Sequence, residues 1–216
     1  MAKKNRGELA TVRAADPDIG ARISNAVLHF IAEVPRTDQL LSSTPAESSR
    51  KRTKLAAKQA AAAAGALALP PGPAGWLTIL PEMVAVWKIQ AQMVADIAAL
   101  YGKTGALSQE HMLYCLFKQT ASQAVRDLVV RMGERLVVKS VSIGVLNTVA
   151  KRIGVNLTQR ALGKGVSRLF PVIGAVGVAA YAYYDTTQVA NVAIKLFEQD
   201  LAMASTPDVP DHVTSP

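Results

Sequence analysis

Residues whose side chains could take part in covalent chemistry are few in this chain and stand far apart. Of the three histidines, only His111 lies near the single cysteine, Cys115. On a helix the two would lie one turn apart on the same face, where a histidine could serve as the base for a cysteine nucleophile. A buried free cysteine also behaves as a small apolar residue, so a packing role for Cys115 stands beside the chemical one.

Four further polar residues stand within segments that are otherwise apolar: Gln90, Asp96, Tyr101 and Asp185. Buried polar groups need hydrogen-bond partners, so Asp96, Tyr101 and Asp185 could line one polar pocket with His111 in an enzyme or lipid-binding module. The alternative for Asp96 is that it faces solvent or pairs with Lys88, two turns earlier on the same helix. No catalytic residue is assigned, and the candidates on geometry alone are His111, Cys115, Asp96 and Asp185.

Sequence motifs for cofactors and metals fail on their spacing. Gly102-Lys103-Thr104 resembles the end of a phosphate-binding P-loop, but the first glycine of that motif would fall on Ile97, and a helical pattern stands where a strand is needed. The chain has no pair of cysteines and no histidine and glutamate at a metal-binding spacing. We therefore expect no cofactor and no metal, and the single cysteine favours a reducing compartment.

Positive charge is concentrated in two parts of the chain. There are 24 Lys and Arg against 16 Asp and Glu, a net charge of +8, and the excess lies in residues 1–60 and 108–170. Each part contains a run of cations that precedes an apolar stretch. The cations are Arg50, Lys51, Arg52, Lys54 and Lys58 in the first run and Lys151, Arg152, Arg160, Lys164 and Arg168 in the second.

A basic run beside an apolar one is typical of a surface that contacts a membrane. Anionic headgroups attract Lys and Arg by about 1 kcal/mol each, while apolar residues enter the interface. The alternatives are an acidic protein partner or simply a solvated helix face, which is the usual role of a charge run. Nucleic acid is disfavoured, because no aromatic residues for base stacking interleave the basic runs and no nucleic-acid-binding signature occurs in the sequence.

The spacing of apolar residues predicts an all-α protein, a compact helical bundle around one long buried helix. Apolar residues recur at steps of three and four on most sides of that helix, and Pro81 in its first turn would place its start later than Trp76. Ser108 is expected to cap the next helix and Pro171 to open the last one. The expected helices cover 20–34, 50–69, 76–101, 108–133, 134–153, 156–168 and 170–201.

Three regions follow from these patterns. Residues 1–49 form a polar N-terminal arm with a short helix and a linker rich in Ser, Thr and Pro, residues 50–203 form the helical domain, and residues 204–216 form a disordered tail. The start of the chain has no apolar secretory signal. We therefore expect a cytoplasmic protein that is peripheral to the inner membrane.

The last helix carries a stripe of small residues that would let another helix approach closely. Its apolar run from 169 to 184 is shorter than the about 20 residues that a membrane span needs, and an earlier apolar run is broken by the turn at 70–73. We expect a buried hairpin or partial insertion in place of a span. The packing residues of this Gly- and Ala-rich segment are Ala175, Ala179, Ala182, Ala190 and Ala193.

Three segments follow one another over about residues 50–200: the turn Pro71-Gly72-Pro73-Ala74-Gly75, the ending Ile97-Ala98-Ala99-Leu100-Tyr101-Gly102 and the segment Pro171-Val172-Ile173-Gly174-Ala175. Together they resemble the EcsC family of bacterial proteins. The resemblance implies a mainly helical, membrane-proximal protein and brings no catalytic residues. Members often have Asn in the helix after the Pro-Val-Ile-Gly segment, where this chain has Tyr184-Asp185, so no role is carried over to that position.

Three hypotheses for function follow. The first is a non-enzymatic, membrane-proximal accessory or adaptor protein whose basic runs bind anionic lipid or an acidic partner. The second is an enzyme or lipid-binding module with a polar pocket around Asp96, Tyr101, His111 and Asp185. The third is an oligomeric structural protein that assembles through the small-residue stripe of the last helix.

Overall fold

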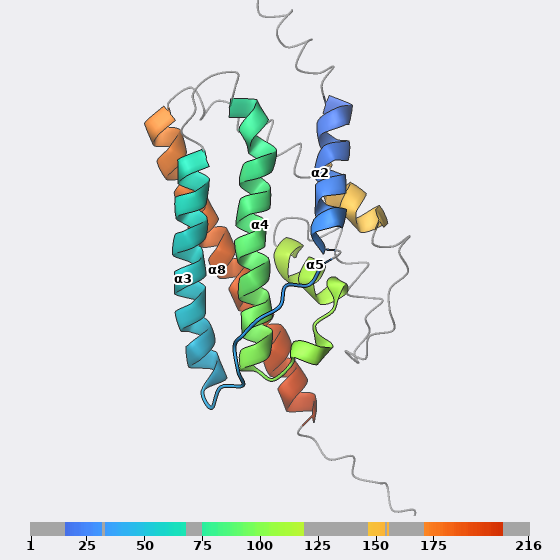
Figure 1. Cartoon of the computed structure of the whole chain (residues 1–216), viewed down its shortest axis with the longest axis vertical. Helices are drawn as coiled ribbons and strands as arrows, with labels where there is room; N and C mark the ends of the chain where they lie inside the picture. The colour runs from blue at the N-terminus through green and yellow to red at the C-terminus, as the bar shows by residue number, and fades with distance from the viewer. Residues whose placement is uncertain are drawn as a thin grey trace, which may run out of the picture.

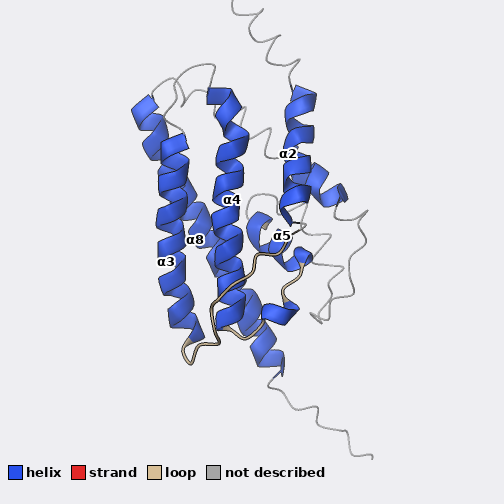
Figure 2. Cartoon of the chain, in the orientation of Figure 1, coloured by secondary structure: helices blue, strands red, loops and turns tan. Residues whose placement is uncertain are grey.

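The computed structural model describes residues 16–31, 33–67, 75–118, 147–153, 155 and 171–204. This described part of the chain consists of helices joined by loops and contains no strand (Figure 2). The predicted all-α class is therefore confirmed. The helices are α2 (Asp16–Ile31), α3 (Pro45–Leu67), α4 (Gly75–Leu100), the 3-10 helix η1 (Thr104–Ala106), α5 (Gln109–Phe117) and α8 (Pro171–Ala204).

Three long helices, α3, α4 and α8, pack together along the length of the bundle, and α2 and α5 lie on the other side of α4 (Figure 1). α3 makes its most extensive contact with α8 and the next with α4. It runs antiparallel to both. Gly65, near the end of α3, lies beside Ala179 in the first part of α8, and Arg52, near the start of α3, pairs with Asp96 near the end of α4. α4 contacts each of the other named helices, which confirms the predicted central helix.

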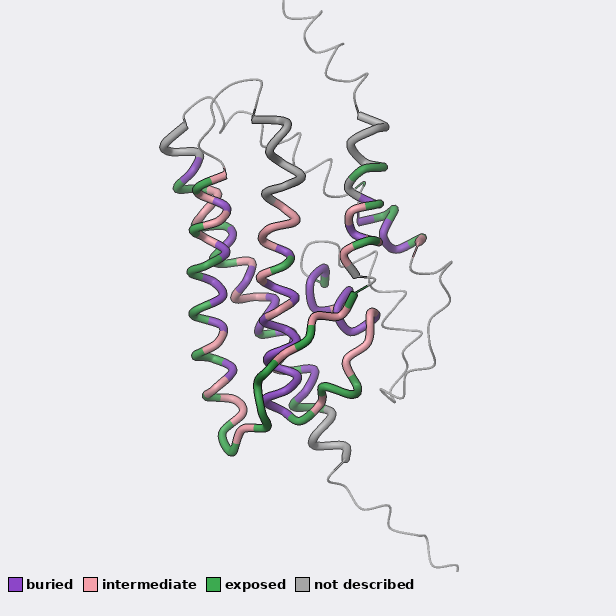
Figure 3. Tube along the Cα trace, in the orientation of Figure 1, coloured by how far each residue is buried: buried purple, intermediate pink, exposed green. Residues whose placement is uncertain are grey.

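The second half of α4 is fully buried. Every residue from 93 to 100 is buried, whereas the preceding turns contain half-buried residues and the exposed Lys88 (Figure 3). This follows from apolar residues on most of the circumference of the helix, because other helices can then cover it from several sides. The helix begins at Gly75, so Pro81 lies in its second turn and the expected later start is wrong.

α3 and α8 approach closely because both present small residues to each other. The buried residues of α3 are Ser49, Thr53, Ala56, Ala57, Ala60 and Ala64. Ala60 and Ala64 form a buried cluster with Ala182 of α8, and a Cβ atom added to Gly65 would lie 3.3 Å from the Cβ of Ala179. Small side chains let two helix backbones come near enough for many dispersion contacts.

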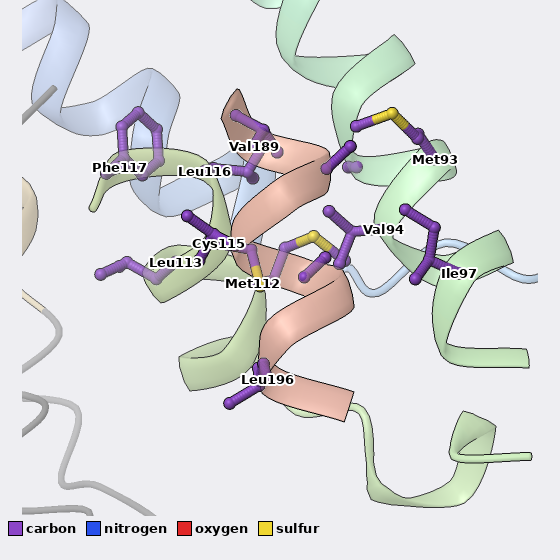
Figure 4. Close-up of a cluster of buried hydrophobic side chains, with 14 of the residues drawn as sticks. Met93, Val94, Ile97, Met112, Leu113, Cys115, Leu116, Phe117, Val189 and Leu196 are labelled. Carbon is purple, nitrogen blue, oxygen red and sulfur yellow. The ribbon is translucent and has the colours of Figure 1, made fainter. Parts of the chain in front are cut away.

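The largest side chains gather where α4, α5 and α8 meet (Figure 4). Phe117 at the end of α5 packs edge-on against Trp87 of α4, with ring centroids 5.2 Å apart, and the ring of Phe30 in α2 lies 6.1 Å from the same indole. Edge-to-face packing adds about 0.5–1.5 kcal/mol beyond the burial of apolar area. These aromatic contacts hold α2 and α5 against the central helix.

Two predicted helix starts are confirmed. Ser108 caps α5, since its hydroxyl accepts a hydrogen bond from the His111 N–H at 3.4 Å and its own N–H donates to His111 Nδ1 at 3.2 Å. This capping box gives a partner to two backbone N–H groups at the helix start. α8 begins at Pro171, where the missing N–H of proline costs nothing because it would have no partner within the helix.

Residues 33–44, which we call the strap, cross α4 in contact with it (Figure 1). Residues 36–44 of the strap were expected to belong to a surface loop or linker, and residues 33 and 34 to the first helix, which ends at Ile31. Gln92 Nε2 donates to the carbonyl of Arg36 at 2.9 Å, and Thr37 Oγ1 donates to Asp96 Oδ1 at 2.6 Å. α3 then begins at Pro45. The expected boundary between residues 49 and 50 therefore falls inside a helix.

Several predicted segments lie outside the described residues. They are the arm 1–15, the turn 70–73, the segment 119–146, the helix 156–168 and the tail from 205. Within the predicted helix 134–153, the described residues 147–153 are helical.

Candidate functional site

The basic run of α3 divides between an outer and an inner side of the helix. Its exposed cations lie on the outer side, and we call them the basic face: Arg50, Lys51, Lys54 and Lys58. Leu55 lies among them with 54% of its surface exposed. Glu47 is the single acidic residue of α3, so the outer side of this helix is strongly positive.

One member of the basic face has an acidic partner among the described residues. Lys51 Nζ lies 2.8 Å from Glu47 Oε1, in an exposed pair one turn apart. The hydrogen bond and the charge of Lys51 lower the pKa of Glu47. Arg50, Lys54 and Lys58 form no ion pair with any residue that the structure describes, so their charges face solvent.

Arg52, expected in the same binding run, belongs to the inner side of α3. Its Nε donates to Oδ2 of Asp96, whose side chain is 3% exposed. Thr37 Oγ1 and Gln92 Nε2 donate to the other carboxylate oxygen at 2.6 and 3.1 Å. One buried carboxylate thus joins the strap, α3 and α4. Asp96 neither faces solvent nor pairs with the exposed Lys88, and both expectations are wrong.

Tyr101 is buried just after α4, where its hydroxyl donates to Glu198 Oε1 of α8 at 3.0 Å. Burial, together with the nearby carboxylate, raises the pKa of Tyr101 to about 12. Its ring lies 6.5 Å from the ring of Phe197. A phenol that stays protonated and bonded in this way fastens α8 to α4 and is not prepared to act as a base.

His111 and Cys115 do lie one turn apart on α5, but their surroundings do not suit a base and its nucleophile. Nδ1 of His111 is engaged by Ser108 in the capping box. Cys115 lies among apolar side chains (Figure 4), and burial raises the pKa of its thiol to about 12. A reactive cysteine needs a lowered pKa and access to solvent, so this thiol acts as a small apolar group.

Asp185 of α8 belongs to another part of the bundle. Gln90 Nε2 donates to its Oδ2 at 2.9 Å. Asp185 also lines a cavity of about 130 Å³, whose wall is mostly apolar and is formed by residues of α3, α4, α5 and α8. Asp96, Tyr101 and His111 are not part of that wall. The structure therefore does not bring the four residues of the predicted polar pocket into one site.

The second predicted basic run is described in part. Lys151 and Arg152 are exposed on the helical residues 147–153, whereas Arg160, Lys164 and Arg168 lie outside the described residues. The described part of this run therefore faces solvent.

The small-residue stripe of α8 is used inside the chain. Ala175, Ala182, Ala190 and Ala193 are buried, and Ala179 is half-buried against α3. The first part of the stripe packs on α3, and the last two alanines belong to the core with α4 and α5. An assembly through this stripe would have to displace these helices.

Some exposed apolar residues were not predicted to have a role. Leu40 and Leu41 of the strap are 82% and 72% exposed, and Val176, Tyr183 and Tyr184 are exposed on α8. The sequence signal for the first pair is a leucine doublet within a segment rich in Ser, Thr and Pro. An open cavity of about 700 Å³ between α2, the strap and α4 was also not predicted, and its wall combines apolar side chains with charges of both signs.

Among the described helices, α4 is long and apolar enough over Met83–Leu100 to cross a membrane, judged by length and composition. Of this window, 61% is buried inside the bundle. The core helix of a soluble protein meets the same criteria, so this is weak evidence for a span.

No protein-family model matches the chain, and no curated protein or solved structure matches it either. The fold and the site define an all-α bundle with a basic outer face on α3.

Proposed function

We propose that this protein is a non-enzymatic accessory or adaptor protein that binds an anionic membrane surface through the basic face of α3. One observation carries the proposal. Arg50, Lys54 and Lys58 follow one another at single-turn spacing on an exposed surface and form no ion pair with a described residue. Lys51 stands beside them in an exposed pair, which headgroup phosphates can replace.

The attraction expected from this surface is moderate and depends on salt. Each Lys or Arg close to an anionic surface contributes about 1 kcal/mol, so Arg50, Lys54 and Lys58 together contribute about 3 kcal/mol, or roughly a hundredfold in affinity, when all three lie at the headgroups, and less when one is held farther away. Exposed charges are screened over a Debye length of about 8 Å at physiological ionic strength. Binding that weakens steeply with added salt is therefore expected.

Two further features support binding over catalysis. The hydroxyl of Tyr101 is bonded to Glu198 of α8, the imidazole of His111 is engaged in the cap of α5, and the thiol of Cys115 is buried with a raised pKa. The resemblance of residues about 50–200 to the EcsC family also implies a helical protein near a membrane.

Sedimentation with lipid vesicles tests the proposal. We expect the wild-type chain to bind vesicles that contain phosphatidylserine at low salt, and to leave vesicles of phosphatidylcholine alone unbound. The variant R50E/K54E/K58E removes three cations and adds three anions on the basic face, and should lose most of this binding. These side chains are exposed, so we expect its thermal unfolding to change little.

A control with the same change in net charge separates the basic face from the total charge. The variant R22E/K88E/K195E reverses exposed cations on α2, α4 and α8 and should keep most of the binding. The proposal is wrong if the wild-type chain stays unbound at low salt, or if the control loses as much affinity as the α3 variant. An acidic protein partner in place of lipid would give the first of these results.

A further inference from the structure

The strap holds two adjacent leucines out of the core shortly before α3 begins. Leu40 is 82% exposed and Leu41 is 72% exposed. Single exposed leucines are common on protein surfaces, but two in succession within a polar segment form a local apolar surface. We call these two residues the leucine tip.

The backbone after the leucine tip is fixed to two helices. Ser42 N–H donates to the carbonyl of Leu100 at the end of α4, at 3.0 Å. The hydroxyl of Ser42 lies 2.9 Å from the hydroxyl of Ser48 in the first turn of α3, and it accepts from the Thr44 N–H at 3.1 Å. These bonds hold the tip in its exposed position at the end of the bundle.

Leu41 also contacts the turn that ends α4. Its Cδ1 lies 3.2 Å from the position that a Cβ atom would take on Gly102, a residue with a φ of 69°. Gly102 N–H donates to Ala99 at 2.8 Å and Lys103 N–H to Ala98 at 2.7 Å, which is the Schellman arrangement of a helix end. Lys103 therefore follows directly on the residue that Leu41 touches.

Cations lie near the two helix ends to which the strap is fixed. Arg50 and Lys51 lie near the start of α3, and Lys103 lies beyond the end of α4. Among the side chains that the structure describes, acidic groups near this end are those of Asp38, Glu47 and Glu198. Glu47 pairs with Lys51, and Glu198 accepts a hydrogen bond from Tyr101. The basic face begins with Arg50 in the second turn of α3 and continues along the helix, away from the tip.

We infer that the leucine tip enters the membrane, and that α3 meets the bilayer by its N-terminal end with Arg50, Lys51 and Lys103 at the level of the headgroups. This rests on the proposed function and adds the inserted residues and the orientation. An anionic bilayer fits because it offers negative headgroups to the cations and apolar chains to the leucines beside them. Interfacial protein segments combine the same two kinds of residue.

A fluorescent label tests the orientation. The variant Leu40→Cys carries an NBD dye, whose emission moves to the blue when it leaves water. Cys115 is buried and stays unlabelled, which the wild-type chain checks. The matched control is Ala62→Cys, an exposed position of α3 that lies about 18 Å farther along the helix than Arg50.

On phosphatidylserine vesicles we expect a blue shift for the dye at position 40 and none at position 62. A shift at both positions would mean that α3 lies flat on the membrane. No shift at position 40 while the chain sediments with the vesicles would mean that the tip stays in water. Either result overturns the inference and leaves the proposed function standing.

The loss of the leucines tests the contribution of the tip to affinity. We expect L40S/L41S to bind phosphatidylserine vesicles about tenfold to a hundredfold more weakly than the wild-type chain, with unchanged circular dichroism. Leu55→Ser, which changes an exposed leucine within the basic face, should have a smaller effect. Wild-type affinity for L40S/L41S would overturn the inference, whereas failure of the wild-type chain to bind at all would overturn the proposed function first.

Light scattering tests whether a second copy of the chain, in place of a membrane, occupies the tip. A wild-type dimer that L40S/L41S dissociates would show that the tip joins two copies of the chain, and would overturn the inference.

The inferred orientation also predicts that Lys103→Glu weakens vesicle binding more than Lys58→Glu, because Lys58 lies about 12 Å farther along α3 than Arg50. The reverse order would contradict it.

Discussion

The ion pair between Arg52 and Asp96 is an interaction whose loss we expect to destabilise the bundle strongly. The Asp96 side chain is 3% exposed and that of Arg52 is 31% exposed. In Arg52→Met the helix keeps a residue of similar helix propensity, but the buried carboxylate loses its counter-charge. Thr37 and Gln92 still donate to one of its oxygens.

The size of the effect follows from burial. Removal of one partner from a fully buried ion pair costs about 3–5 kcal/mol, because the remaining charge is left without compensation. About a third of Arg52 is exposed, so water can reach the vacated position and replace part of the interaction. We therefore expect the free energy of unfolding to fall by about 2–3 kcal/mol, a large part of the 5–15 kcal/mol or so that is typical of a domain.

Urea unfolding followed by circular dichroism measures this change. The matched control is Arg50→Met, an exposed cation of the same helix, for which we expect a change within about 0.5 kcal/mol. Combining Arg52→Met with Asp96→Asn should cost less than the sum of the two single changes, since the neutral amide needs no counter-charge. An effect of Arg52→Met no larger than that of Arg50→Met would refute the assigned role of the pair.

Three further predictions concern packing, pH and capping. Gly65→Leu should destabilise the bundle by about 1–3 kcal/mol, because α8 leaves no room for a side chain there. Gly177→Leu should be neutral or stabilising in the same urea assay, because a Cβ atom at this position would have no atom of another residue within 4 Å. Burial raises the pKa of Cys115 from 9.0 and of Tyr101 from 10.0, each to about 12. Their contribution to stability is therefore complete below pH 9 and is lost as the pH rises toward 12. Over this interval the double variant C115A/Y101F should lose less stability than the wild-type chain, and an equal loss would contradict the assigned pKa shifts. Ser108→Ala should lower the free energy of unfolding by about 1 kcal/mol through the lost cap of α5, and an unchanged melting temperature would speak against the capping box.

Features that depend on neighbouring residues were predicted well. The cap at Ser108 and the start of α8 at Pro171 are correct because a cap requires residues within a single turn. The early start of α3 also has a local signal, since Pro45 and Glu47 both favour a first helical turn. The Ser- and Thr-rich composition around them pointed instead to a loop, and composition does not show whether a loop packs on a helix.

The candidate site was predicted in part for the same reason. A count of cations along the chain indicates a basic helix, but not which cation turns inward. Arg52 differs from its neighbour Lys51 by a rotation of about 100° on the helix, and this places it on the side that α4 covers. The exposure of Leu40 and Leu41 likewise depends on the bonds that fix the strap to the helix ends.

By itself, the sequence determined the all-α class, the central helix, the small-residue stripe and the concentration of positive charge, because residue spacing and local charge are properties of short segments. Only the tertiary structure decided which distant residues meet. Asp96 pairs with Arg52, 44 positions away, and not with Lys88 on its own helix. The reason is physical: the antiparallel packing of α3 on α4 encloses the carboxylate, and a buried charge needs a partner on the helix that covers it.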